Sequence, residues 1–170
     1  PNMATKKKEE KSYPPTNKFM QLAIDEAKKG IKKGEGGPFG AVIIHSKTKK
    51  VIAKSHNLVL KNNDPTAHAE ITAIRNATKK LKRFHLEDCE LYTTCEPCPM
   101  CYSAIYWARI KKVTFGATRA DAKAAGFDDA KIYNILKGKQ KNNQFKTKQL
   151  NKAQCKKPFE EWNKNNKQQY

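Results

Sequence analysis

The sequence has no long hydrophobic run, and its number of cysteines is odd. The first feature argues against a membrane-spanning protein and the second against a secreted disulfide scaffold. The longest apolar stretch is about as short as residues 41–44, far below the ~20 residues that a membrane-spanning helix needs. No stretch has the apolar core of a secretory signal peptide. Four of the five cysteines crowd into one short segment (Cys89, Cys95, Cys98, Cys101). This clustering is unlike a secreted disulfide scaffold and indicates metal chemistry in a reducing, cytoplasmic compartment.

Acidic residues are scarce relative to basic ones. Lys and Arg number 35 against 16 Asp and Glu, which gives a formal net charge of +19. The C-terminal segment 137–170 is the most basic part of the chain, with ten Lys and two Glu. Such a charge favours nucleic-acid partners. However, only four of the basic residues are Arg, the side chain best suited to bidentate base and phosphate contacts. We therefore interpret the charge mainly as a solubility feature, with a nucleic-acid-binding face as the less favoured alternative.

The length of 170 residues suits one domain with a proper core. We expect a flexible leader over 1–16 and a single domain over 17–170. Hydrophobic periodicity predicts strands over 41–45, 51–55, 90–94 and 113–116. It predicts helices over 17–33, from the Asp64-Pro65-Thr66 start signal to residue 81, over 99–109, over 127–136 and over 159–162, with 137–157 irregular. This alternation indicates an α/β sandwich with helices on both faces of one sheet.

Two short segments carry metal-ligating residue types. His68 and Glu70 stand at a predicted helix start, and Cys98 and Cys101 stand at another. Cysteines three residues apart on the first turn of a helix can hold one ion, and a helix N-terminus favours the thiolate form. With His68 as third ligand, the fourth tetrahedral position is left for water, as in catalytic zinc sites. We predict one zinc ion per chain, held by His68, Cys98 and Cys101.

Glu70 fits a proton-transferring role at this site. Residues two apart on a helix point in nearly opposite directions, so His68 and Glu70 can converge only beyond the N-terminal end of the helix. There the carboxylate would reach the zinc-bound water, take its proton and pass it to a leaving group. The alternative is a closed structural site in which Cys95 is a fourth ligand, and such a site has no use for Glu70.

The chain resembles the zinc-dependent nucleobase deaminases of the cytidine-deaminase-like fold. Its residues 68–70 (HAE) and 97–101 (PCPMC) match the H-x-E and P-C-x-x-C motifs of these enzymes. Within them, the chain resembles small, bacterial-type guanine deaminases. The segments that carry this likeness are GGPFGAVI (36–43), NDPTAHAE (63–70), LYTTCEPCPMC (91–101), AIYWAR (104–109) and AGFDD (125–129). The resemblance spans about 19–136. It implies a three-layer α/β/α sandwich whose central mixed sheet has about five strands.

The resemblance also implies roles for further residues. Asn57 would bind the purine, Phe39 and Trp107 would form walls of the base pocket, and Asp129 would assist departure of ammonia. It implies a homodimer in which the segment 137–170 is exchanged, so that Tyr170 covers the pocket of the other copy. Simpler interpretations stay open: Asn57 as a turn residue, Phe39 and Trp107 as core aromatics, and Asp129 as a helix cap.

The activity that follows is hydrolytic deamination of guanine to xanthine and ammonia. The alternatives are a guanosine deaminase, a tRNA or other RNA nucleobase deaminase favoured by the charge, and a zinc-stabilised binding module with no activity. The remaining histidines (His45, His56, His85) show no partner pattern, and we expect them to be ordinary surface or core residues.

Overall fold

The computed structural model describes residues 15–165 and 168–170. Its strands are β1 (Gly40–His45), β2 (Val51–His56), β3 (Cys89–Cys95) and β4 (Lys112–Ala117). They form one sheet in the order β2-β1-β3-β4, in which β1 pairs antiparallel with β2 and β3, and β3 pairs parallel with β4. The mixed sheet is as predicted. Within the described residues it has four strands rather than about five, because the chain beyond β4 continues into helices and a polar segment.

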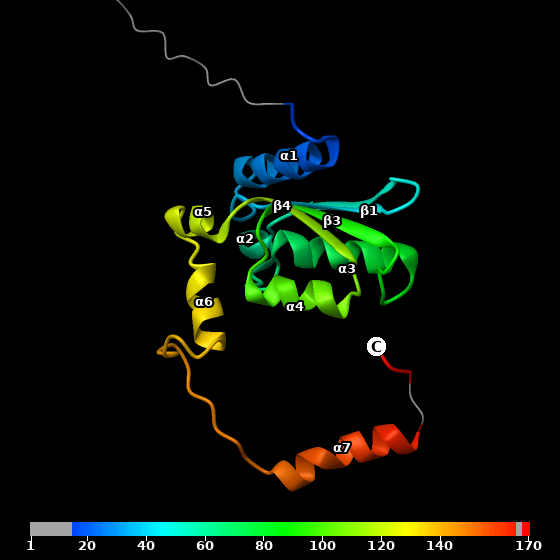
Figure 1. The fold of residues 1–170 in the computed structure, drawn as a ribbon, viewed down its shortest axis with the longest axis vertical. Coiled ribbons are helices and arrows are strands. Elements are labelled where there is room, and N and C mark those ends of the chain that lie inside the picture. Colours follow the sequence, from blue (N-terminus) through cyan, green and yellow to red (C-terminus); the bar gives the residue numbers. More distant parts are fainter. Residues whose placement is uncertain (1–14, 166–167) are drawn as a thin grey trace, which may run out of the picture.

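Helices cover both faces of the sheet (Figure 1). Alternate side chains of β1 point to opposite faces. Val42 and Ile44 pack against α1 (Lys18–Lys32), while Ala41 and Ile43 belong to the core beneath α3 (Ala69–Leu81) and α4 (Pro99–Trp107). All four of these β1 side chains are fully buried. The strand is therefore sandwiched on both sides, which confirms the three-layer α/β/α architecture.

The parallel pair explains where the site forms. Parallel neighbours require a crossover, and here α4 connects β3 to β4. As a result β3 and β4 end at the same edge of the sheet, and α3 and α4 begin at that edge (Figure 1). The loop that carries Cys98 and the start of α3 are thereby brought together.

Two helix boundaries differ from the prediction. Asp64 does not cap α3; its carboxylate accepts hydrogen bonds from the backbone N–H and hydroxyl of Thr66 and closes a turn. The helix begins only at Ala69, which makes His68 its N-cap residue. The second difference is at the end of α4, which stops at Trp107 rather than at the predicted residue 109. Arg109 adopts a left-handed conformation with φ 61°, which does not continue a helix.

Two short helices were not predicted. The four-residue helix α2 (Val59–Asn62) follows β2, and α5 (Arg119–Ala124) follows β4. A capping box starts α5: Thr118 and Asp121 exchange side-chain and backbone hydrogen bonds. After α5 comes α6 (Asp129–Leu136), two residues shorter than predicted and capped by the side chain of Asp128.

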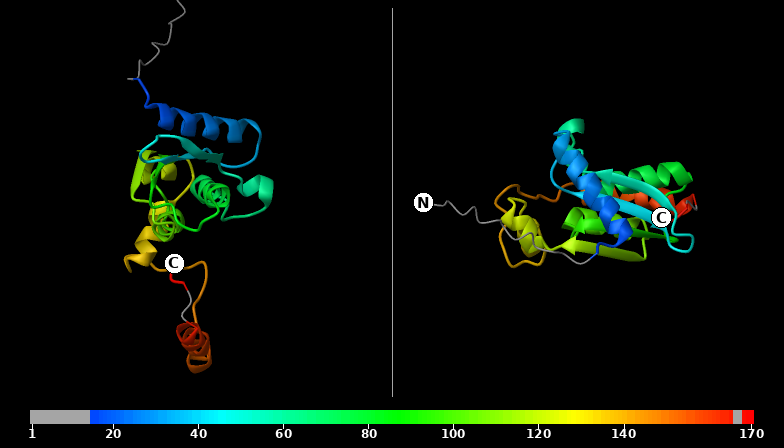
Figure 2. Two further views of the ribbon diagram at one scale, coloured as in Figure 1. Left: turned by 90° about the vertical axis from the view of Figure 1, so that its right-hand side faces the viewer. Right: turned by 90° about the horizontal axis from the view of Figure 1, so that it is seen from above.

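The C-terminal segment leaves the layered part of the molecule. Residues 138–151 contain no helix or strand, and α7 (Lys152–Lys164) then forms a helix separated from the sheet and its covering helices (Figures 1 and 2). This helix is much longer than the short one predicted over 159–162. The leader predicted over 1–16 lies outside the described residues, apart from 15 and 16. Among the helices described, none has the length and apolar character to cross a membrane.

Candidate active site

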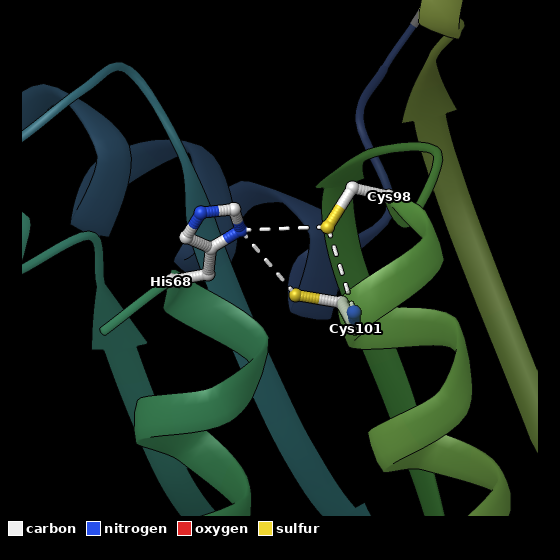
Figure 3. A group of neighbouring side chains, drawn as sticks. All are labelled: His68, Cys98 and Cys101. Carbon is white, nitrogen blue, oxygen red and sulfur yellow. Dashed lines mark hydrogen bonds between the residues drawn. The ribbon is translucent and has the colours of Figure 1, made fainter. Parts of the chain in front are cut away.

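The starts of α3 and α4 lie side by side at the edge of the sheet (Figure 3). His68 is the N-cap residue of α3, and Cys98 is the N-cap residue of α4, followed by Pro99 at the first helical position. Cys101 lies on the first turn of α4, and its backbone N–H donates to Cys98 Sγ at 3.5 Å. The three side chains point toward one another across the gap between the helices (Figure 3).

The spacing of their donor atoms suits zinc. Nδ1 of His68 lies 3.6 Å from Cys98 Sγ and 3.5 Å from Cys101 Sγ. All three donor atoms lie within 4.8 Å of one another. In a tetrahedral site, Zn–S bonds of about 2.3 Å and Zn–N bonds of about 2.0 Å place nitrogen and sulfur about 3.5 Å apart. Both nitrogen–sulfur distances therefore already match those that one zinc ion requires.

The pKa values of the two thiols are shifted in opposite directions. A hydrogen bond from the Cys101 thiol, together with the nearby His68, lowers the pKa of Cys98 to about 4. The same contact with Cys98, and burial, raise the pKa of Cys101. Hydrogen bonding to Cys98 raises the pKa of His68. The cluster thus holds one thiolate ready for a cation, and binding a divalent ion would displace the remaining protons.

Cys95 does not join this cluster. Among the described residues, the group that can hold a metal consists of the predicted three alone. The thiol of Cys95 is directed at the backbone carbonyl of Thr118, 3.8 Å away, and burial raises its pKa to about 11. The described residues therefore supply three donors rather than four, and a tetrahedral zinc ion held by them would keep one position for water.

Glu70 lines the same cavity as two of the three donor side chains. This cavity has a volume of about 380 Å³, and His68, Glu70 and Cys98 all line it. The side chain of Glu70 is only 6% exposed, and loss of hydration raises the pKa of its carboxyl group. A carboxyl group with a raised pKa is suited to accept a proton and release it again near neutral pH.

The cavity walls bring together three more of the predicted residues. Asn57 is buried directly after β2, and its Oδ1 accepts from the backbone N–H of Val59 at 3.0 Å. Phe39 packs edge-on against Phe127, with ring centroids 4.9 Å apart. Asp129, the first residue of α6, also lines the cavity, and burial raises its pKa. Because Asp128 caps α6, the simpler interpretation of Asp129 as a helix cap is not supported.

Trp107 and Tyr170 lie outside this cavity in the single chain. Trp107 stands at the opposite end of α4 from Cys98 and is 62% exposed. Tyr170 returns to this end of the helix, with its ring centroid 6.2 Å from that of Trp107 and 6.3 Å from that of Phe84. Neither residue lines the cavity beside the three donor side chains. Their predicted roles in substrate binding stay predictions.

The metal-binding loop is braced by a group that the sequence analysis missed. Arg119 donates from its backbone and guanidinium to the carboxylate of Glu96, which lowers the pKa of Glu96. The guanidinium also stacks on Tyr133, 3.9 Å from the ring centroid, and the Tyr133 hydroxyl donates to the carbonyl of Pro97 at 2.7 Å. The segment from α5 to α6 thereby fixes the loop that precedes Cys98. In the sequence, the spacing of Thr118 and Asp121, which form the capping box of α5, is the signal that could have indicated this segment.

Comparison with known proteins places the chain among zinc-dependent deaminases. Residues 14–117 match the family described as the cytidine and deoxycytidylate deaminase zinc-binding region. This match covers more than half of the chain and includes all three donor residues. The chain therefore belongs to this family, and zinc is its metal.

Individual relatives within this family include guanine deaminases and tRNA-specific adenosine deaminases. The guanine deaminase of Bacillus subtilis (strain 168) is 47% identical over 153 residues, which cover 89% of this chain and 97% of that protein. An X-ray structure of guanine deaminase from Bacillus subtilis superposes with a TM-score of 0.83 at 45% identity, covering 91% of this chain and 99% of that one. The tRNA-specific adenosine deaminase of Aquifex aeolicus (strain VF5) is 46% identical over 118 residues, covering 69% of this chain and 74% of that protein.

Proposed function

We propose that this protein is a guanine deaminase that hydrolyses guanine to xanthine and ammonia. The observation that carries the proposal is the position of Glu70: a buried carboxyl group with a raised pKa opens on the same cavity as the zinc-ligating side chains. Similarity over nearly the whole length of a guanine deaminase supports guanine as the substrate.

His68, Cys98 and Cys101 would hold the metal. When bound there, zinc lowers the pKa of a coordinated water toward about 7 and so supplies a nucleophile at neutral pH. Glu70 would accept a proton from the attacking water and deliver it to the ring nitrogen beside C2, while a bond forms between that carbon and the water oxygen. Glu70 would then accept the proton of the hydroxyl group now on C2 and pass it to the amino group, so that the bond from C2 to the amino nitrogen breaks and ammonia leaves. Asp129, which lines the same cavity, would assist this departure.

The walls would select the base. The Oδ1 of Asn57 is occupied by the N–H of Val59, so its amide NH₂ group is the part that donates to a ring acceptor. The rings of Phe39 and Phe127 give the purine an apolar surface. A buried polar group that fits one hydrogen-bonding edge rejects bases with another edge, because it is then left unpaired.

One experiment separates this proposal from its alternatives. The zinc-loaded protein is incubated separately with guanine, guanosine, cytosine and a tRNA anticodon stem-loop, and released ammonia is measured. We expect release from guanine. Release from guanosine or from the stem-loop in its place would identify the nucleoside or RNA alternative, and no release from any of them would favour a binding module. The RNA reaction should also weaken steeply with salt, whereas turnover of the free base should not.

We further propose that the protein is a homodimer in which the segment 137–170 packs on the other copy. Large apolar side chains of this segment are exposed in the single chain (Phe145, Leu150, Phe159, Trp162). Exposed aromatic residues also gather on α4 and β4 (Tyr102, Tyr106, Trp107, Phe115). Two exposed apolar surfaces on one molecule favour association. Exchange of the segment would offer Tyr170 to the pocket of the other copy. A cytoplasmic location stays a prediction.

A further inference from the structure

Three ionisable side chains are buried behind the cavity wall, and the reaction does not use them. Glu26 of α1 is 8% exposed, Glu35 of the following loop is 9% exposed and His56, the last residue of β2, is 9% exposed. Charged groups are rarely buried unless they are paired, since loss of hydration is costly. The sequence pattern gave no sign of this group, because its members are far apart in the chain.

The imidazole of His56 bridges the two carboxylates. Its Nδ1 lies 2.7 Å from Glu26 Oε2, and its Nε2 lies 3.4 Å from Glu35 Oε1. A neutral ring carries only one N–H and could donate to only one of these oxygens, whereas the doubly protonated ring donates to both. Gly30 makes room for it, because a Cβ at this position of α1 would lie 2.6 Å from the ring.

A fourth residue completes the group at the surface. Lys61 of α2 places its Nζ 3.0 Å from Glu35 Oε2. Within the described residues this buried oxygen has no hydrogen bond of good geometry, so the ion pair with Lys61 is what balances its charge. The same contact is the main cause that lowers the pKa of Glu35. Two acidic and two basic side chains thus alternate in a chain of contacts from α1 through β2 and the loop to α2.

This charge network (Glu26, His56, Glu35, Lys61) supports the residues that line the cavity. His56 directly precedes Asn57, and Glu35 directly precedes Gly36; both neighbours line the cavity. The carbonyl of Glu35 accepts hydrogen bonds from the backbone N–H groups of Leu60 and Lys61, at 3.1 and 3.0 Å. The loop before β1 and the residues after β2 are therefore joined to each other by the network and form one wall.

We propose that His56 is a positioning residue, which through Glu26 and Glu35 holds the Asn57 wall of the cavity in place to bind the purine. This inference rests on the proposed function for its substrate. Removing the imidazole of His56 would leave two buried carboxylates without their shared hydrogen-bond partner, and the wall would relax away from the base. The zinc ligands and Glu70 lie on other elements, so the chemical step would be largely spared.

The test compares three variants of the full, zinc-loaded chain. His56→Gln removes the imidazole that bridges the two carboxylates but keeps a polar side chain of similar size. Lys61→Met leaves the buried oxygen of Glu35 unbalanced while changing an exposed residue, so it is expected to fold even if His56→Gln does not. Lys54→Met is the matched control, because Lys54 is an exposed lysine on β2 outside the network.

We expect the KM for guanine to rise about tenfold in His56→Gln and less in Lys61→Met, with kcat within about twofold of wild type, since binding is lost without loss of the chemical step. Zinc content should stay at one per chain. Hydrogen exchange at the Leu60 and Lys61 amides should become about tenfold faster in both variants, because the wall opens locally. Lys54→Met should resemble wild type in each measurement.

Unchanged KM and unchanged amide exchange in folded His56→Gln and Lys61→Met would overturn the inference, as would an equal rise of KM in Lys54→Met. A loss of kcat with unchanged KM would also contradict it. Failure of the wild-type protein to deaminate guanine would refute the proposed function instead. The exchange measurement needs no turnover and would still decide whether the charge network holds this wall.

Discussion

Gly36 offers a direct way to displace the substrate wall without touching the zinc site. A Cβ added at Gly36 would lie 2.2 Å from Asn57 Oδ1 and 2.4 Å from the Asn57 carbonyl oxygen. Ordinary van der Waals contact for a Cβ begins at 3.4 Å. Gly36→Ala therefore requires the loop and Asn57 to separate by about 1 Å.

The consequence for activity follows from this displacement. A shift of about 1 Å in a group that orients substrate can cost roughly a hundredfold in rate, equivalent to about 2.7 kcal/mol. Overpacking at a tight contact also destabilises the fold by roughly 1–3 kcal/mol. We therefore expect kcat/KM for guanine to fall about a hundredfold in Gly36→Ala, with one zinc per chain retained.

Gly34→Ala provides the matched control in the same loop. Gly34 has φ +64° and nothing within 4 Å of an added Cβ. Alanine there costs about 1 kcal/mol of stability through backbone strain but does not approach the cavity wall. Steady-state kinetics, zinc content and thermal unfolding of both variants are the measurements. If folded Gly36→Ala keeps kcat/KM within twofold of wild type, Asn57 does not position the substrate in the way described.

The remaining predictions concern the metal, the braced loop and the assembly. Added zinc should raise the melting temperature of wild type but not of Cys101→Ser, because a ligand that binds only the folded state stabilises it; scanning fluorimetry checks this. Glu96→Gln should cost about 0.5–1 kcal/mol at pH 7. Pairing with Arg119 lowers the pKa of Glu96 in the folded protein. The stabilisation is therefore fully present above the pKa that Glu96 has in the unfolded chain, and it is lost as the pH falls through the lower pKa of the folded state. Denaturant unfolding curves of variant and wild type should accordingly converge in acid. Phe159→Asp with Trp162→Asp should shift a dimer to monomer in light scattering, and an unchanged mass would contradict the proposed exchange.

The zinc site was predictable from the sequence because its residues come in short, local patterns. His68 and Glu70 are two residues apart, and Cys98 and Cys101 are three apart, each pair at a helix start. The structure brings the two pairs together as expected. The inference that the zinc lies beyond the N-terminal end of the helix agrees with the position of His68, which precedes the first helical residue.

Other features depend on contacts between distant segments, and local patterns do not encode them. The Asp64-Pro65-Thr66 sequence has the composition of a helix start, but the hydrogen bonds between Asp64 and Thr66 close a turn instead. His56 was expected to be an ordinary histidine, since its two carboxylate partners lie 21 and 30 residues away. Contacts between two copies of a chain are likewise absent from local patterns, so the roles predicted for Trp107 and Tyr170 come from the resemblance alone.

The most direct test of the account is the activity of zinc-loaded Glu70→Gln. Glutamine keeps the shape of the side chain but cannot take up and return a proton. The account predicts one zinc per chain, an unchanged fold and a fall in guanine turnover of roughly 10²–10⁴-fold, the contribution typical of a general acid–base group. A variant that binds zinc normally and releases ammonia from guanine at close to the wild-type rate would contradict it.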